Sequence, residues 1–375
     1  MRDPRAEAIR AGIGALPPAV RAILDRHGFE MDGFMDLADR WLAGDMDRDA
    51  RRDPASVRPV PDDSIIRAHR EGTPQHAEAV AAGVDAIRRG EVGAVVMNGG
   101  MATRFGGVPK GTAEALPGRS FLALKIAQIR ALPGAVPMYV MNSFATEEAT
   151  ERHIAGLRPD IPVRCFAQGV GVRLTLDGAV FVDPRDPPAT LYAPGHGDLP
   201  SAIRSSGLLD GFTAAGGRWL VMSNVDNVGA TVDPAIVGQV ILSGRRVAAE
   251  LAERVAGDSG GMPAVVEGRP QILEAFRLPA GFDDSAIRWF NTNTIVVAAR
   301  IFERPMPLSW FAVRKSIDGR PAIQFERLIG EVTAFEEPLL LGVPRTGPRS
   351  RFLPVKTPED LERLRPAIAA VVGGW

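Results

Sequence analysis

The chain has 375 residues, 45% of them hydrophobic, and a formal net charge of −1, a composition typical of an ordinary globular protein long enough for two or three lobes. A charge this close to zero gives no electrostatic reason to expect a nucleic acid polymer as a partner, and no apolar stretch is long enough to predict a membrane span or a signal peptide. The single cysteine, Cys165, excludes an intrachain disulfide and a cysteine zinc site, so we expect a reducing, cytoplasmic environment.

Residues 1–75 predict a helical segment followed by a linker. Apolar residues recur at helical spacing from Ala6 to Ile13 and from Val20 to Leu24, and two prolines separate the two runs. The stretch from Gly44 to Gln75 is rich in Asp, Arg and Pro, which indicates a surface connection with little structure of its own. Its clustered acids could suggest a metal site, but runs of mixed charge are more often solvated surfaces.

Residues 76–335 predict a core in which strands and helices alternate. An alanine-rich helix from His76 to Gly90 precedes the first of four short apolar runs, each with the length of a buried strand. The runs are Ala94–Met97, Val136–Met141, Val163–Phe166 and Arg218–Met222. Because helical patterns separate most of these runs, we expect a mainly parallel sheet covered by helices.

The loop that follows the first run, NGGMATRFGGVPKG, has the composition of an anion-binding loop. Its two glycine pairs let the backbone approach a ligand, and Arg104 and Lys110 add positive charge. It is neither a Walker A loop, because Pro109 precedes the lysine, nor a G-x-G-x-x-G fingerprint. A glycine-rich connection with two solvated cations is the simpler alternative, but only four of the 44 cationic residues are lysines, so a lysine kept here suggests a specific task.

Two further motifs place a titratable side chain in a short loop. His196 lies between glycines in PGHGD, where the imidazole could donate a hydrogen bond to a phosphate or sugar oxygen. Asp226 follows the fourth apolar run in SNVDN, so its carboxylate should emerge at the same sheet edge as the glycine loop. One carboxylate together with phosphate oxygens can hold Mg²⁺, although an aspartate in a turn also commonly caps the next segment.

The later motifs offer two amides and a cation. In WFNTNT, Asn291 and Asn293 are two positions apart, so on a strand both side chains would face the same way and could bind sugar hydroxyls, or else cap the strand end. Lys356 lies just before a helix that has Thr357 at its N-cap. It could reach a phosphate only if the C-terminal segment, residues 336–375, folds back over the sheet edge.

Taken in order, the motifs NGGMATRFGGVPKG, PGHGD, SNVDNVGATVD, FNTNT and SRFLPVKTPEDL resemble those of the UTP-dependent sugar-1-phosphate uridylyltransferases. This is the UDP-glucose pyrophosphorylase family, which also includes UDP-N-acetylglucosamine pyrophosphorylases. The likeness runs from about Gly90 to Arg365. It implies an α/β fold with a GT-A-like nucleotidyltransferase core of mainly parallel mixed sheet over residues 76–335, an N-terminal helical segment, and a small C-terminal lobe that returns to the active site.

The resemblance also implies roles for individual residues. The catalytic cations would be Arg104, Lys110 and Lys356, and Asp226 would hold Mg²⁺. The nucleotide would be bound by Gly99, Gly100, Thr103, Gln168, Gly195 and His196, with Gln168 and Gly195 at the uracil. The sugar would be bound by Asn224, Gly261, Glu274, Asn291 and Asn293. Two departures from the family pattern are Ala102, where a third loop glycine is usual, and an early end at Trp375, which leads us to expect no C-terminal β-helix and leaves the oligomeric state unpredicted.

The implied reaction joins UTP and a sugar 1-phosphate into a UDP-sugar and pyrophosphate by in-line attack on the α-phosphorus. Glucose 1-phosphate is favoured as the sugar substrate because the NVDN and FNTN motifs look closer to the UDP-glucose branch, with a UDP-N-acetylglucosamine or broad-specificity pyrophosphorylase as the alternative. A protein that binds or senses a nucleotide sugar without turning it over is an alternative of another class, but it would not need Asp226 or Lys356. A dehydrogenase is disfavoured because the dinucleotide fingerprint is missing.

Overall fold

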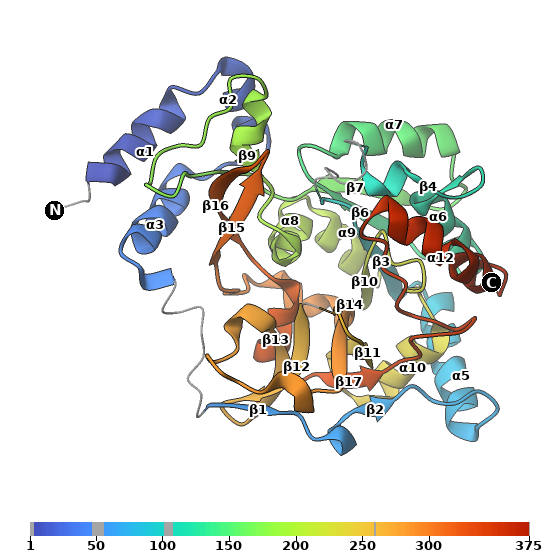
Figure 1. The fold of residues 1–375 in the computed structure, drawn as a ribbon. Coiled ribbons are helices and arrows are strands. Elements are labelled where there is room, and N and C mark those ends of the chain that lie inside the picture. Colours follow the sequence, from blue (N-terminus) through green and yellow to red (C-terminus); the bar gives the residue numbers. More distant parts are fainter. Residues whose placement is uncertain (1–3, 47–55, 101–107, 259, 375) are drawn as a thin grey trace.

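The computed structural model describes residues 4–46, 56–100, 108–258 and 260–374, and its centre is an eight-stranded sheet (Figure 1). In spatial order the strands are β2 (Ile66–Arg67), β17 (Leu339–Gly342), β11 (Val247–Glu253), β14 (Trp289–Ala298), β10 (Trp219–Asn224), β3 (Val92–Met97), β6 (Met138–Asn142) and β7 (Val163–Ala167). Strand β14 runs antiparallel to both of its neighbours, and the other pairings are parallel. The predicted mainly parallel mixed sheet is confirmed. Each of the four apolar runs coincides with a strand, and the ends of run and strand differ by at most two residues.

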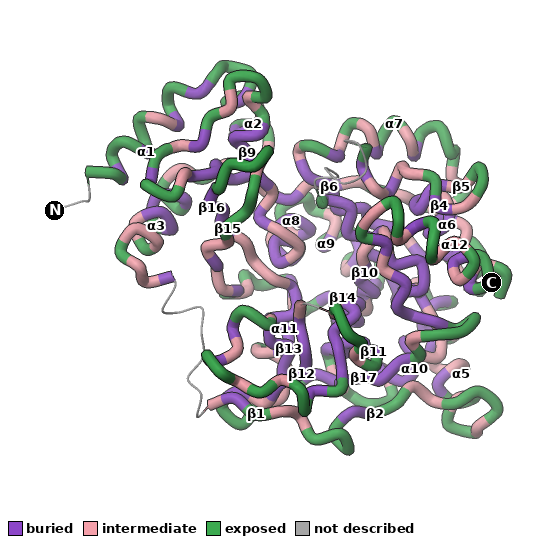
Figure 2. Tube along the Cα trace, in the orientation of Figure 1, coloured by how far each residue is buried: buried purple, intermediate pink, exposed green. Residues whose placement is uncertain are grey.

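Both faces of this sheet are covered, which explains why its central strands read as unbroken apolar runs. In β3, Ala94 and Val96 pack into one hydrophobic cluster, and Val95 and Met97 pack into another, because successive strand side chains point to opposite faces. Figure 2 shows the central strands as buried and the outer surfaces of the covering helices as exposed or intermediate.

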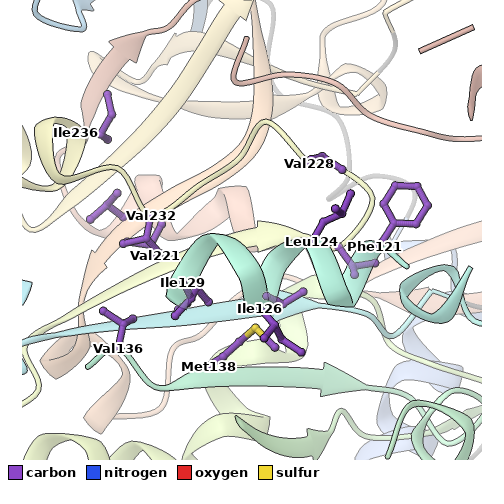
Figure 3. Close-up of a cluster of buried hydrophobic side chains, with 14 of the residues drawn as sticks. Phe121, Leu124, Ile126, Ile129, Val136, Met138, Val221, Val228, Val232 and Ile236 are labelled. Atoms are coloured by element: carbon purple, nitrogen blue, oxygen red, sulfur yellow. The ribbon is translucent and has the colours of Figure 1, made fainter. Parts of the chain in front are cut away.

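The first face is covered by α5 (Pro74–Arg88), α6 (Phe121–Arg130), α7 (Glu147–Leu157), α10 (Pro234–Ser243) and α12 (Pro358–Val372). The second face is covered by α8 (Leu199–Ser205), α9 (Leu208–Ala214) and α11 (Val332–Phe335). Figure 3 shows the part of the first cluster around α6, where Ile126 and Ile129 lie close to Val136 and Met138. Helix α6 begins directly after Ser120, whose hydroxyl accepts a hydrogen bond from the Ala123 N–H as an N-cap.

The predicted N-terminal helices are present as α1 (Pro4–Gly14), α2 (Pro18–Arg26) and α3 (Met31–Leu42). They pack against a second layer of short strands, β8 (Gly171–Val172), β9 (Leu191–Tyr192), β15 (Phe311–Ile317) and β16 (Arg320–Glu326). Figure 1 shows these helices (blue) beside the β15–β16 hairpin (orange). The helical segment therefore shares a hydrophobic cluster with residues from the middle and end of the chain.

Part of the predicted linker has a defined structure. Strand β1 (Val57–Pro59) pairs with β12 (Gly261–Val266), which pairs in turn with β13 (Arg269–Glu274), and β2 extends the central sheet through β17. The expectation of a connection with little structure of its own is therefore wrong for residues 57–67, because pairing with distant strands outweighs the local composition. The domain boundaries after residues 75 and 335 stay a prediction.

The remaining strands form a small hairpin, β4 (Glu114–Leu116) with β5 (Arg119–Ser120), just after the glycine loop. Within the described residues, none of the helices has both the length and the apolar content needed to cross a membrane.

Candidate active site

Lys110 and Asp226 meet beyond the carboxyl ends of two adjacent strands. Strands β3 and β10 are parallel, with Met97 opposite Asn224, so the loops that follow them leave the sheet at the same edge. Lys110 Nζ donates a hydrogen bond to Asp226 Oδ2 at 2.6 Å. The two side chains are 25% and 15% exposed, so both remain accessible to a ligand while they neutralise one another.

The C-terminal segment closes this site from the other side. Lys110 Nζ also donates to the carbonyl oxygen of Val355 at 2.9 Å, and the Val355 N–H donates to the carbonyl oxygen of Asp226 at 3.3 Å. Lys356, the next residue, is exposed, and its backbone N–H is held by the Asp360 carboxylate at 3.1 Å. The fold therefore returns the chain around Lys356 to the loops after β3 and β10, as the proposed role of this lysine requires.

A second group of expected site residues converges at the ends of β3 and β7. Gln168 Oε1 accepts a hydrogen bond from the Gly195 N–H at 3.1 Å. A Cβ atom at Gly99 would stand 1.9 Å from Gln168 Nε2, so only a glycine lets this amide approach the backbone after β3. Gly195 has φ +89°, a left-handed conformation that glycine adopts without strain. Gly99, Gln168 and Gly195, all expected at the nucleotide, therefore lie together.

The imidazole of His196 is held as a neutral hydrogen-bond donor. The Ile329 N–H donates to His196 Nδ1 at 2.9 Å, which leaves the ring proton on Nε2. Burial lowers the pKa of His196 to about 4, with a small opposing effect from the Glu326 carboxylate. His196 can therefore donate from Nε2 to an oxygen of a ligand at neutral pH, but it does not contribute a positive charge.

Two asparagines connect the end of β10 with β14. Asn293 Nδ2 donates to Asn224 Oδ1 at 3.1 Å, and the Asn293 N–H donates to Asn291 Oδ1 at 3.1 Å. Asn293 has φ +58°, and the pairing of β14 with β11 shifts its register between Ala249 and Leu251. The expectation that Asn291 and Asn293 extend from a regular strand is therefore wrong, because β14 is irregular at Asn293 and the two side-chain amides have different hydrogen-bond partners.

The other expected sugar residues lie on the β12–β13 hairpin. Gly261 is paired with Glu274, and a Cβ atom at Gly261 would stand 3.0 Å from Glu274 Oε1 and 3.1 Å from Asn291 Nδ2. The Gly261 backbone therefore lies close to both the Glu274 carboxylate and the Asn291 amide. Burial raises the pKa of Glu274 to about 7, and the nearby Arg277 partly opposes this rise.

Some expected residues lie outside this description. Arg104 and Thr103 fall between the described ranges, whereas Gly100, at the end of one, is exposed. In the described part of the chain, no three side chains of His, Cys, Asp or Glu gather into a group that could hold a metal ion. Asp226, a partly exposed carboxylate at this sheet edge, is the residue that could hold a metal ion together with oxygens of a substrate.

Comparison with known proteins identifies the family. The sequence profile described as UTP–glucose-1-phosphate uridylyltransferase matches residues 31–368. The chain belongs to this family. The family expected from the ordered motifs is therefore confirmed, and with it the enzyme class, a nucleotidyltransferase.

Individual members of the UTP–glucose-1-phosphate uridylyltransferase family align over most of the chain. The enzyme of that name from Hordeum vulgare is 28% identical over 393 residues, which cover 99% of this chain and 80% of the relative. The Saccharomyces cerevisiae enzyme of that name is 30% identical over 88% of this chain and 69% of the relative.

Solved structures with the same fold include proteins that are named for UDP-glucose and proteins that are named for UDP-N-acetylglucosamine. The UDP-glucose phosphorylase from Trypanosoma brucei has a TM-score of 0.74 at 22% identity, covering 93% of this chain and 79% of that one. The uridine diphosphate N-acetylglucosamine pyrophosphorylase from the same organism has a TM-score of 0.75 at 19% identity, covering 96% and 81%. These likenesses confirm the nucleotidyltransferase fold, and the fold by itself does not distinguish the two sugars.

One residue at the base of the site lies outside all the motifs that carry the family resemblance. Lys125, in α6, is only 2% exposed, and its ammonium donates to the carbonyl oxygens of Asn227 at 2.8 Å and Ala230 at 2.6 Å and to Ser223 Oγ at 3.3 Å. Burial and then the charge of Arg351 lower the pKa of Lys125 to about 7, while the carboxylates of Asp226 and Glu250 oppose this shift. A lysine within the apolar run of residues 121–127, in a chain with only four lysines, is the sequence signal that could have drawn attention to it.

A second residue that the sequence reasoning missed, Asp198, holds the loops that contain Gln168 and Gly195. Asp198 Oδ2 accepts a hydrogen bond from the Gly169 N–H at 2.7 Å, and its other oxygen forms an ion pair with Arg327. Gly169 follows Gln168, and Asp198 closes the PGHGD motif. The Asp198 N–H also donates to the Gly195 carbonyl at 3.1 Å, so Asp198 holds the backbone beside Gln168 and at Gly195, a role that the motif alone did not reveal.

Proposed function

We propose that this protein catalyses the transfer of a uridylyl group from UTP to glucose 1-phosphate, which yields UDP-glucose and pyrophosphate. One observation carries the proposal. Lys110 donates hydrogen bonds to Asp226 and to the Val355 carbonyl, although these partners lie 116 and 245 positions away in the sequence. The fold thus brings Lys110, at the end of the glycine loop, together with the NVDN loop and the segment before Lys356 at one sheet edge, as a transferase centre for charged phosphates needs.

The proposed chemistry needs positioning and positive charge more than proton transfer. A phosphate oxygen of glucose 1-phosphate attacks the α-phosphorus of UTP, and the bond from this phosphorus to the bridging oxygen breaks. The electron pair of that bond leaves with pyrophosphate, and the nucleophile needs no base because it is already ionised near neutral pH. We assign Lys110 and Arg104 to the charge of the leaving pyrophosphate and Lys356 to the phosphate under attack.

Mg²⁺ is the divalent cation that we propose for the site, with Asp226 as its protein ligand. The donor set fits this ion, since Mg²⁺ usually binds one or two carboxylates and completes its shell with waters and phosphate oxygens. When bound, the ion would neutralise charge on the triphosphate. Asp226 is now paired with Lys110, so the lysine would have to release the carboxylate and become available to the phosphates.

The specificity residues are assigned by the groups that they present. Gln168 and the Gly195 backbone offer amide groups suited to uracil, and His196 offers a neutral Nε2–H to a phosphate or sugar oxygen. Around the hexose we assign Asn224, Gly261, Glu274, Asn291 and Asn293. Glucose is favoured over N-acetylglucosamine by the names of the relatives that align in sequence.

The test is a pyrophosphate-release assay with purified protein, UTP, Mg²⁺ and a panel of sugar 1-phosphates. We expect the highest kcat/KM with glucose 1-phosphate, and clearly lower values with the galactose and N-acetylglucosamine compounds. A preference for N-acetylglucosamine 1-phosphate would support the alternative pyrophosphorylase. Binding of UDP-glucose without turnover in either direction would instead support a nucleotide-sugar sensor. A cytoplasmic location stays a prediction, and the oligomeric state is not predicted.

A further inference from the structure

We propose that Lys125 is a positioning residue for the transferase reaction: its buried ammonium holds the loop that carries Asn224 and Asp226 in the conformation that the site needs. This inference rests on the proposed function and extends it to a residue outside the family motifs. Lys125 does not touch the expected substrate positions, so it would act through the loop.

The contacts of Lys125 bracket Asp226 on both sides. Ser223 comes before Asp226 in the chain, and Asn227 and Ala230 come after it, so the three acceptors of the ammonium span residues 223–230. The loop is a tight turn, with the Asn227 N–H donating to the Asn224 carbonyl at 3.2 Å. Removing the ammonium would leave two carbonyl oxygens without this donor inside the fold, and the turn would lose its anchor to α6.

The same loop holds the C-terminal segment in place. Asn227 Nδ2 donates to the Arg351 carbonyl at 3.0 Å, and Asn227 Oδ1 accepts from the Leu353 N–H at 2.8 Å. The Arg351 guanidinium is buried in a bidentate ion pair with Glu250, with distances of 2.7 and 2.6 Å. A chain of contacts therefore runs from Lys125 through Asn227 to the segment that ends at Lys356, and movement of the loop would displace both sides of the site.

Charge is the second reason to assign this role to a lysine. The groups that influence Lys125 electrostatically are the carboxylates of Asp226 and Glu250 and the guanidinium of Arg351. None of these three charged groups accepts a hydrogen bond from the Lys125 ammonium. The acceptors of the ammonium are all neutral oxygens. A buried ammonium that is bonded only to neutral oxygens is costly to keep charged, which agrees with its lowered pKa, and all three of its acceptors lie in the loop that carries Asp226.

The experiment compares Lys125→Met, which keeps the length of the side chain and removes the donors, with Gln128→Met. Gln128 is buried one turn further along α6, and the hydrogen bonds that tie this helix to the Asp226 loop are made by Lys125 and not by Gln128. We expect Lys125→Met to lower kcat about 10- to 100-fold and to raise the half-saturating Mg²⁺ concentration by at least threefold, while Gln128→Met changes both by less than twofold. Calorimetry adds a readout without turnover: excess Mg²⁺ should increase the affinity for UDP-glucose less in Lys125→Met than in the wild type.

A double-mutant cycle tests whether Lys125 acts through Asp226. In an Asp226→Asn background, Lys125→Met should cause less than a threefold further loss, because residues that act through one another are not additive. If Lys125→Met does not fold, the same measurements are made on Lys125→Gln, which keeps a donor without a buried charge. The inference is overturned if the folded variant keeps wild-type kcat and Mg²⁺ dependence, or if the two losses multiply. An inactive wild type would instead overturn the proposed function.

Discussion

The Lys110 ammonium and the Asp226 carboxylate are 2.6 Å apart at the edge where β3 and β10 end. A lysine that neutralises a carboxylate here can turn to a phosphate when a ligand arrives, because its side chain is flexible and one quarter exposed. Arginine, which dominates the cations of this chain, has a rigid planar head that is less suited to such an exchange.

Lys110→Met should lower kcat by about 10²- to 10³-fold, which corresponds to roughly 3–4 kcal/mol of lost transition-state stabilisation. The reason is that the variant lacks the positive charge that we assign to the leaving pyrophosphate. Lys315→Met is the matched control, since Lys315 lies on the β15–β16 hairpin in an ion pair with Glu326 and has no proposed role. Pyrophosphate release under saturating substrates measures the effect, and a kcat within threefold of the wild type for Lys110→Met would refute the assignment.

Lys356→Met should produce a loss of similar size, about 10²-fold or more in kcat, because this cation is assigned to the phosphate under attack. The backbone at Lys356 is held by Asp360 and by the pairing of Val355 with Asp226, so truncating the side chain should leave the segment in place. The thermal midpoint should therefore stay within a few degrees of the wild type. A large drop in the midpoint together with the loss of activity would indicate a structural role instead.

Gly99→Ala should weaken UTP binding without affecting folding greatly. The added methyl group would stand 1.9 Å from Gln168 Nε2, so the amide must leave its position and its hydrogen bond with the Gly195 N–H. Loss of the polar contact that we propose between Gln168 and uracil should raise the KM for UTP about tenfold and reduce the preference over other nucleoside triphosphates. Gly156→Ala in α7 is the control, because nothing lies within 4 Å of the Cβ it would add. Equal KM values for both variants would contradict the placement of Gln168.

How far the sequence predicts this site depends on how many positions separate the contacting residues along the chain. The sequence could place Asp226 near the end of the glycine loop because the strand ends of a parallel sheet meet at one edge. This rule does not require knowledge of contacts with distant residues. Lys125 was not predictable, since its acceptors lie about a hundred positions away and are mostly backbone carbonyls, which every sequence possesses. The conformation of Asn293 escaped prediction for a related reason: its positive φ follows from the register shift between β14 and β11, and a two-residue alternation does not reveal a bulge.

The neutral state of His196 predicts how stability depends on pH. Its pKa is about 4 in the folded protein and near 6.5 when unfolded, so between these values the unfolded chain binds more protons and the folded state loses stability as the pH falls. His196→Asn removes this term and keeps an acceptor for the Ile329 N–H. The free energy of unfolding of the wild type relative to this variant should therefore shrink by up to about 3 kcal/mol from pH 6.5 to pH 4, given about 1.4 kcal/mol for each pKa unit.

Denaturation at several pH values measures the difference. A constant difference would mean that His196 titrates alike in both states, and an inflection in kcat/KM near pH 6.5 that is lost in His196→Asn would show that the imidazole is not held neutral.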